Sequence, residues 1–295
     1  MTLICRRMIC VQQIEDFLDN KVTRFFALQR KYLCIPYVVF LLLFIIAPIL
    51  IIVFYAFTYE VVDPATNSAS LHFSFQAFIN FFTDWSKINV LLVSLFIALI
   101  TTLLCLLIGF PLAFFLADKK VNKNVALITL FIAPMWINFV LRTGATRDLL
   151  TWMGINGGTH PYLATIVGMV QNYLPFVVLP LYTTMLKLDK SQVEAARDLG
   201  ANPVQVFFKN IIPQAVPGIV SACLMTFMPT MSSYVISDTL SEGKITLFGS
   251  YIELEFINKA WNDGSFMALV MLVFIAITMI ISQKFSGDER EAGSW

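Results

Sequence analysis

The chain has 295 residues, of which 58% are hydrophobic and 13% are charged. Together with a mean hydropathy of +0.77, this composition argues against a soluble domain and favours a protein that crosses a membrane several times. The basic residues are spread over separate turns without a nucleic-acid-binding motif, so no nucleic acid is expected among the partners.

The first segment, residues 1–34, has apolar and charged side chains at helical spacing. It is predicted to be a cytoplasmic amphipathic helix that lies on the inner leaflet of the membrane. A cleaved signal peptide is not expected, because the first apolar run starts late, has the full length of a span and lacks a small-x-small cleavage site.

About six apolar runs are long enough for an α-helix to cross the bilayer. They predict an all-α transmembrane domain over residues 35–284, followed by a cytoplasmic tail over residues 285–295. Internal prolines are expected to kink several of these helices, which neighbouring helices tolerate in a membrane. The predicted spans are approximately Pro36–Phe57, Asn89–Ala117, Val125–Leu141, Leu163–Met185, Ala215–Ile236 and Phe266–Gln283.

The distribution of Lys and Arg predicts the orientation of the spans. With the N-terminus in the cytoplasm, about three quarters of the 20 basic residues lie on the cytoplasmic side. Both termini are therefore expected inside. The outer loops then carry more acidic than basic residues, which would favour a cationic solute, unless insertion simply keeps basic residues out of these loops. The aromatic-rich outer loop Thr58–Ile88 fits an interfacial belt or a docking surface for a soluble binding protein.

The stretch Val193–Ile219 is a polar island in this hydrophobic chain. Ser191 is predicted to cap a helix, with Glu194 completing a capping box. Gly200 suits the left-handed residue that ends a helix, and Asn202-Pro203 can begin the next one. Two short helices are therefore expected to meet at a tight corner, either as a docking element or as an ordinary solvated surface helix.

This stretch resembles the Glu-Ala-Ala loop of permease subunits in type I ATP-binding-cassette (ABC) importers. The matching residues are Glu194, Ala195, Ala196, Gly200 and Pro213, whereas Asn210 and Ile212 depart from the pattern and are not expected to touch the docking helix. The resemblance implies a MetI-like permease fold. It also implies a cytoplasmic coupling loop over residues 187–214 that docks on an ATPase through Glu194, Ala195, Ala196, Arg197, Asp198 and Gly200.

A second stretch is similar to permeases of the polyamine branch. It combines Pro134, Trp136 and Asn138 with Leu141-Arg142-Thr143, although Gly144-Ala145-Thr146 replaces the Tyr-Ala-Trp that commonly follows. The resemblance implies import of spermidine or putrescine. The residues expected along the substrate pathway are Tyr234, Asp238, Ser232, Ser233, Asn138 and Trp136. Gln171 and Asn172 place amides within a predicted span, where they would either line the pore or bond a neighbouring helix.

The chain lacks the motifs of an enzyme. It has no phosphate-binding loop and no triad or paired-carboxylate motif, and its Cys and His residues do not have metal-ligand spacing. A non-catalytic permease in the bacterial plasma (inner) membrane is therefore expected, with no catalytic residue, metal or cofactor of its own. The implied partners are a second homologous permease, a dimeric cytoplasmic ATPase that carries ATP and Mg, an extracytoplasmic polyamine-binding protein and membrane lipid. The alternatives are a same-fold importer of sulfate, iron or a phosphonate, and a stand-alone secondary transporter or channel.

Overall fold

The structure is a computed structural model that describes residues 36–62, 69–118 and 126–292. The chain divides into two compact units, Met1–Tyr55 and Ala56–Trp295. The predicted amphipathic segment 1–34 lies outside the described residues. In the first unit, a π-helical turn η1 (Leu42–Ile46) leads into α2 (Ala47–Ala56), within the predicted first span.

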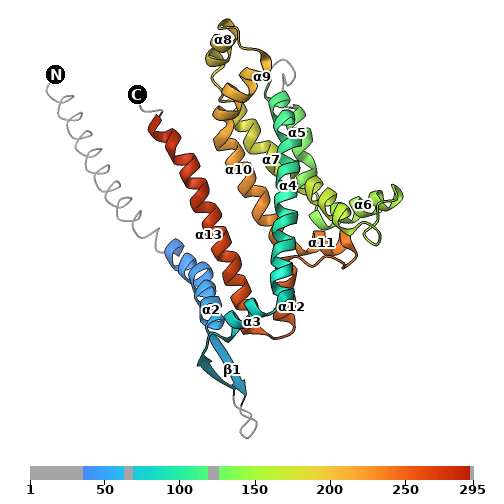
Figure 1. Cartoon of the computed structure of the whole chain (residues 1–295), viewed down its shortest axis with the longest axis vertical. Helices are drawn as coiled ribbons and strands as arrows, with labels where there is room; N and C mark the ends of the chain where they lie inside the picture. Colours follow the sequence, from blue (N-terminus) through green and yellow to red (C-terminus); the bar gives the residue numbers. More distant parts are fainter. Residues whose placement is uncertain (1–35, 63–68, 119–125, 293–295) are drawn as a thin grey trace, which may run out of the picture. The chain divides into compact units, whose positions relative to one another are not determined.

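The second unit is built around three helices, α4 (Trp85–Ala117), α7 (Pro161–Met185) and α10 (Ile212–Ser232), which pack side by side (Figure 1). Glycines allow close approach between them. A Cβ on Gly109 of α4 would lie 2.9 Å from Cγ1 of Val177, and one on Gly218 of α10 would lie 2.5 Å from Oγ1 of Thr184. A long helix α13 (Trp261–Ala292) contacts α10 and continues through most of the predicted tail.

Most predicted spans are confirmed as helices, but the third is broken. Instead of running from Val125 to Leu141, the chain forms α5 (Ala126–Ile132) and a 3₁₀ turn η2 (Ala133–Trp136), then bends by 96° into α6 (Phe139–Trp152). Asn138 stabilises the break, because its Oδ1 accepts a hydrogen bond from the amide of Val140 and so caps α6.

The fifth predicted span also ends earlier than expected. Rather than reaching Ile236, α10 stops at Ser232, and Ser233 has an extended conformation before α11 (Tyr234–Ser241) begins. Next along the chain, α12 (Phe248–Ile257) packs against α13. The short helices α11 and α12 lie at the opposite end of this unit from α8 (Lys190–Asp198) and α9 (Pro203–Val206) (Figure 1).

The predicted outer loop contains regular structure. An antiparallel hairpin of β1 (Thr58–Val62) and β2 (Ala69–Phe73) precedes α3 (Gln76–Thr83). On α3, Phe81 is buried in the core, whereas Phe78 and Phe82 are exposed. The hairpin is a local exception to the predicted all-α class, and the exposed rings fit either of the two uses predicted for this loop.

Candidate coupling loop and translocation cavity

Asp189, rather than the predicted Ser191, caps α8, the helix predicted to dock on an ATPase. Its Oδ1 accepts hydrogen bonds from the amide of Ser191 at 3.0 Å and from the Ser191 hydroxyl at 2.6 Å. These bonds lower the pKa of Asp189. A carboxylate is favoured at this end of a helix because the free amides there carry partial positive charge. Ser191 therefore contributes as a donor, and Glu194 lies exposed on the surface of α8.

The corner after α8 forms as predicted. Gly200 has a φ of +82°, and the amides of Gly200 and Ala201 donate to the carbonyls of Arg197 and Ala196 at 2.9 and 3.1 Å. This pair of bonds is a Schellman motif, which satisfies carbonyls that the helix end would leave unpaired. Asn202 and Gln205 then form a complete capping box at the start of α9. The corner fixes the direction in which α8 leaves the membrane helices.

The predicted docking residues lie mainly on the free face of α8. Glu194, Ala195, Arg197, Asp198 and Gly200 are exposed, whereas Ala196 is half-buried. The inward face of α8 packs Val193 and Ala196 against the core formed by α4, α7 and α10. The helix is therefore anchored along one side and open to a partner along the other.

Asn210 contradicts the prediction that it lies clear of the docking helix. It belongs to a π-helical turn, η3 (Phe207–Ile211), between α9 and α10, and its Nδ2 donates to the backbone carbonyl of Gln192 in α8 at 3.4 Å. Sequence spacing could not reveal this contact, because it depends on how the chain folds back after the Gly200 corner.

At the other end of α10, a cavity of about 590 Å³ opens between η2, α6, α7, α10 and α11. Five of the six predicted pathway residues line it: Trp136, Asn138, Ser232, Ser233 and Tyr234. Asp238 is not among the lining residues and lies exposed on α11. The break before α6 and the break after α10 thus meet at one cavity, and both breaks expose backbone groups that an unbroken helix would pair internally.

The lining of this cavity is aromatic and carries one charged side chain, Arg142. The aromatic rings come from Trp136, Phe139, Tyr173, Phe176 and Tyr234. Among the described residues that line the cavity, none has a carboxylate. A cationic solute would therefore meet ring faces, hydroxyls and carbonyls on this wall.

Arg142 donates to oxygen atoms of η2, before the bend, and of the neighbouring helix α7, contacts that the sequence did not reveal. Its Nε donates to Oδ1 of Asn172 at 2.8 Å, its Nη2 to the Asn172 carbonyl at 3.3 Å, and its Nη1 to the Pro134 carbonyl at 3.0 Å. Buried Asn172 also donates to Oγ1 of Thr143. Asn172 therefore bonds a neighbouring helix, one of the two uses predicted for it, and it also lines the cavity.

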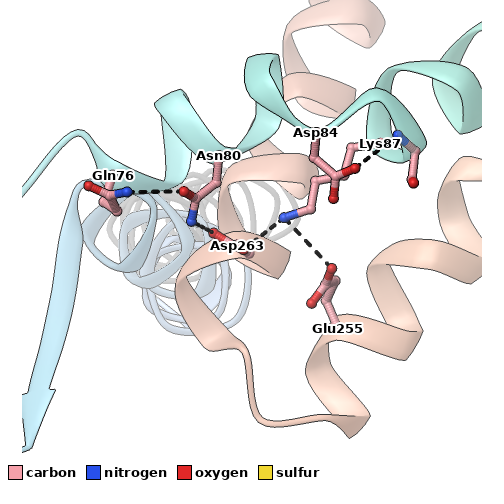
Figure 2. Close-up of polar contacts among 7 residues, drawn as sticks. Gln76, Asn80, Asp84, Lys87, Glu255 and Asp263 are labelled. Atoms are coloured by element: carbon pink, nitrogen blue, oxygen red, sulfur yellow. Dashed lines mark hydrogen bonds and ion pairs between the residues drawn. The ribbon is translucent and has the colours of Figure 1, made fainter.

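A cluster of ion pairs joins α3, α4, α12 and α13. Figure 2 shows the ammonium of Lys87 between two carboxylates, Asp263 at 2.7 Å and Glu255 at 3.8 Å, while Asn80 donates to Asp263. Lys87 is only 5% exposed. Burial raises the pKa of Glu255, and the charge of Lys87 partly opposes this rise. The sequence identified these residues only as outer-side charges.

A family model and curated relatives of this chain both indicate a transport permease. The model of the family described as "Binding-protein-dependent transport system inner membrane component" matches residues 109–287. A spermidine/putrescine transport system permease protein PotB from Salmonella typhimurium is 36% identical, over 67% of this chain and 74% of that protein. The protein of the same name from Escherichia coli K12 is 35% identical, over 67% of this chain and 78% of its own length.

Solved structures share the fold. A subunit of a bacterial ABC transporter that imports the acidic polysaccharide alginate superposes with a TM-score of 0.58 at 18% identity, over 94% of this chain and 99% of its own. A chain of the MetNI methionine ABC transporter in an inward-facing conformation gives a TM-score of 0.51 at 18% identity, over 68% and 96% of the two chains.

Proposed function

The chain belongs to the family of binding-protein-dependent transport system inner membrane components, and we propose that it is the permease subunit of an ATP-driven importer of spermidine or putrescine. The relatives named for spermidine/putrescine transport support this solute over sulfate, iron or a phosphonate. The protein crosses the membrane several times. In the proposed orientation both termini and α8 lie in the cytoplasm.

The observation that carries the proposal is the arrangement of α8 and the cavity at opposite ends of one helix. The outer face of α8, with Glu194, Ala195 and Arg197, is exposed, and α10 leads from the inner side of this helix to Ser232 at the cavity. We propose that a dimeric cytoplasmic ATPase binds the exposed face, that ATP and Mg act on that partner, and that closure of the ATPase moves α8. A second permease of the same family would complete the pore, and an extracytoplasmic binding protein would deliver the solute.

The cavity suits weak and brief contact with a polyamine. Each contact between an ammonium group and an aromatic face contributes about 0.5 to 2 kcal/mol, which guides a cation without trapping it. The guanidinium of Arg142 is engaged by carbonyl and amide oxygens, and its charge disfavours a long stay for a polycation. Selectivity is then left to the binding protein.

The test is uptake of labelled spermidine and putrescine into proteoliposomes that hold this chain with its co-encoded partners. We expect uptake that requires both ATP and the binding protein. ATP hydrolysis stimulated by the loaded binding protein without polyamine uptake would reject the solute. Polyamine uptake by the permease alone would reject the importer class.

A further inference from the structure

Four hydrogen bonds connect the proposed coupling helix α8 and its cap, the turn η3 and the start of α10. Gln214 of α10 is their centre: its Nε2 donates to Oε1 of Gln192 at 3.2 Å and to Oδ1 of Asn210 at 2.6 Å. Its Oε1 accepts from the amide of Asp189 at 3.2 Å. Asn210 in turn donates to the Gln192 carbonyl at 3.4 Å. We call Gln192, Asn210 and Gln214 the amide clamp.

The local backbone explains why the clamp faces α8. Pro213 has no amide hydrogen, and the turn before it widens so that the amide of Ile212 bonds the carbonyl of Phe207, five residues back. Because this π turn holds one more residue than an α-helical turn, the side chains before and after it are rotated relative to their positions in a regular α-helix. Asn210 and Gln214 then lie four residues apart on one face, where their side chains bond each other and Gln192.

The clamp is distinct from the docking face of α8. Val193 and Ala196 hold the inward side of the helix by apolar packing, while Glu194, Ala195, Arg197 and Asp198 stay exposed. Apolar packing permits sliding, because it has no directional preference. Hydrogen bonds at both the first turn and the cap of α8 fix its orientation relative to α10.

Through α10 the clamp is connected to the cavity. This helix has 21 residues and is about 30 Å long. Gln214 lies in its first turn, whereas Pro229 and Ser232 line the cavity at its other end. If the clamp transmits a movement of α8 to the first turn of α10, this one helix carries the movement to the cavity.

We propose that the amide clamp is the connection that makes α10 follow the coupling helix, so that Gln192, Asn210 and Gln214 are positioning residues for energy coupling. The inference rests on the proposed function for its setting, since it assumes that an ATPase moves α8. The movement is then transmitted by side-chain amides of this chain. Two of them, Asn210 and Gln214, lie after Gly200 and thus outside the Glu-Ala-Ala motif.

The test compares the wild type with Gln214→Met in the assembled complex, which retains the length of the side chain and removes its amide. Hydrogen–deuterium exchange is followed in α8 and in residues 226–232 of α10 with and without ATP. We expect α8 to respond to ATP in both complexes. The response of α10 should fall by about three- to ten-fold in Gln214→Met, the factor expected for losing one or two amide hydrogen bonds.

Two further variants separate the clamp from general damage. Gln76→Met removes an exposed amide that bonds only Asn80 among its described contacts, far from the coupling loop, and should behave as the wild type. Pairing Gln192→Glu with Gln214→Lys replaces the 3.2 Å amide contact with an ion pair and should restore the response of α10.

Equal ATP-dependent changes of exchange in α10 of the wild type and of Gln214→Met would contradict the proposed role of the clamp. A wild-type α10 whose exchange does not change with ATP would contradict it too. Neither result depends on which solute is carried. A wild-type complex that fails to take up polyamine rejects the proposed solute, while the exchange comparison still decides the role of the clamp.

Discussion

At Gly200 the left-handed backbone conformation by itself favours glycine. Its φ is +82°, yet a Cβ built there would meet no atom within 4 Å. A larger side chain is therefore disfavoured by the left-handed conformation and not by crowding. The residue is required because the chain must reverse at the end of α8.

We predict that Gly200→Ala weakens the corner by about 1 kcal/mol, the usual cost of a left-handed non-glycine residue. Stimulation of ATP hydrolysis by the loaded binding protein should then fall in the assembled complex. The matched control is Gly144→Ala in α6, which also has open space around it but has no positive φ. Equal loss in both variants would show that the corner is not involved.

Single substitutions can distinguish the roles of Tyr234 and Asp238 in the substrate pathway. Tyr234 lines the cavity, whereas Asp238 does not. We predict that Tyr234→Ala slows polyamine uptake by about three- to ten-fold, since one cation–π contact is lost, without changing capture by the binding protein. Asp238→Asn should have the smaller effect on initial uptake rates. The reverse order would place the pathway at Asp238, outside the lining of the cavity.

At the scale of elements, the contact between α7 and α10 depends on a close approach at Gly218. A Cβ at this position would lie 2.5 Å from Oγ1 and 2.8 Å from Cβ of Thr184, so one of the helices would have to shift. Because both helices line the cavity further along, this contact sets the spacing of its walls.

We predict that Gly218→Ala lowers the stability of the complex by about 1 to 3 kcal/mol through overpacking. Thr184→Ala removes the side-chain oxygen and methyl group that a Cβ at position 218 would meet. The double variant should therefore recover part of the loss, as thermal unfolding in detergent would show. Additive losses in the double variant would mean that the two residues do not compete for space.

Across the whole described unit, the Lys87 cluster joins residues that are far apart in the sequence. Lys87 lies in the first turn of α4, Glu255 lies on α12 and Asp263 lies near the start of α13. Removing Lys87 would leave two largely buried carboxylates without a counterion. We predict that Lys87→Met costs roughly 2 to 4 kcal/mol at neutral pH.

The pH dependence of this loss has a definite sign. Burial raises the pKa of Glu255 in the folded protein, so the folded state binds more protons than the unfolded state between the two pKa values. The free energy of unfolding therefore falls as pH rises from about 4.3 through the folded pKa. Lys87→Met removes an opposing charge and extends this fall to higher pH.

Unfolding temperatures between about pH 4.5 and 8 would show a larger deficit for Lys87→Met at the higher pH. Adding Glu255→Gln should remove most of that slope. Arg147→Met is the matched control, because it breaks an exposed ion pair to Asp148 and should change stability by about 0.5 kcal/mol or less. A deficit independent of pH would mean that lost packing, and not the carboxylate charge, causes it.

Local signals in the sequence determined much of this molecule. Apolar runs of sufficient length predicted the spans, because a helix must pair its own backbone groups in lipid. Gly200 and Asn202 predicted the corner of the coupling loop, since caps act within a few residues. The residues Glu194 to Gly200, together with Pro213 and the hydrophobic spans around them, predicted the permease family.

Only the tertiary structure decided how distant polar groups meet. The 96° bend before α6 is held by Arg142, Asn172 and the Pro134 carbonyl, and these belong to separate elements. The contact between Asn210 and Gln192, the burial of Lys87 and the position of Asp238 outside the cavity lining have the same origin. Hydropathy and caps report on neighbours along the chain, whereas a hydrogen bond or ion pair across the fold exists only once packing has placed both partners within reach.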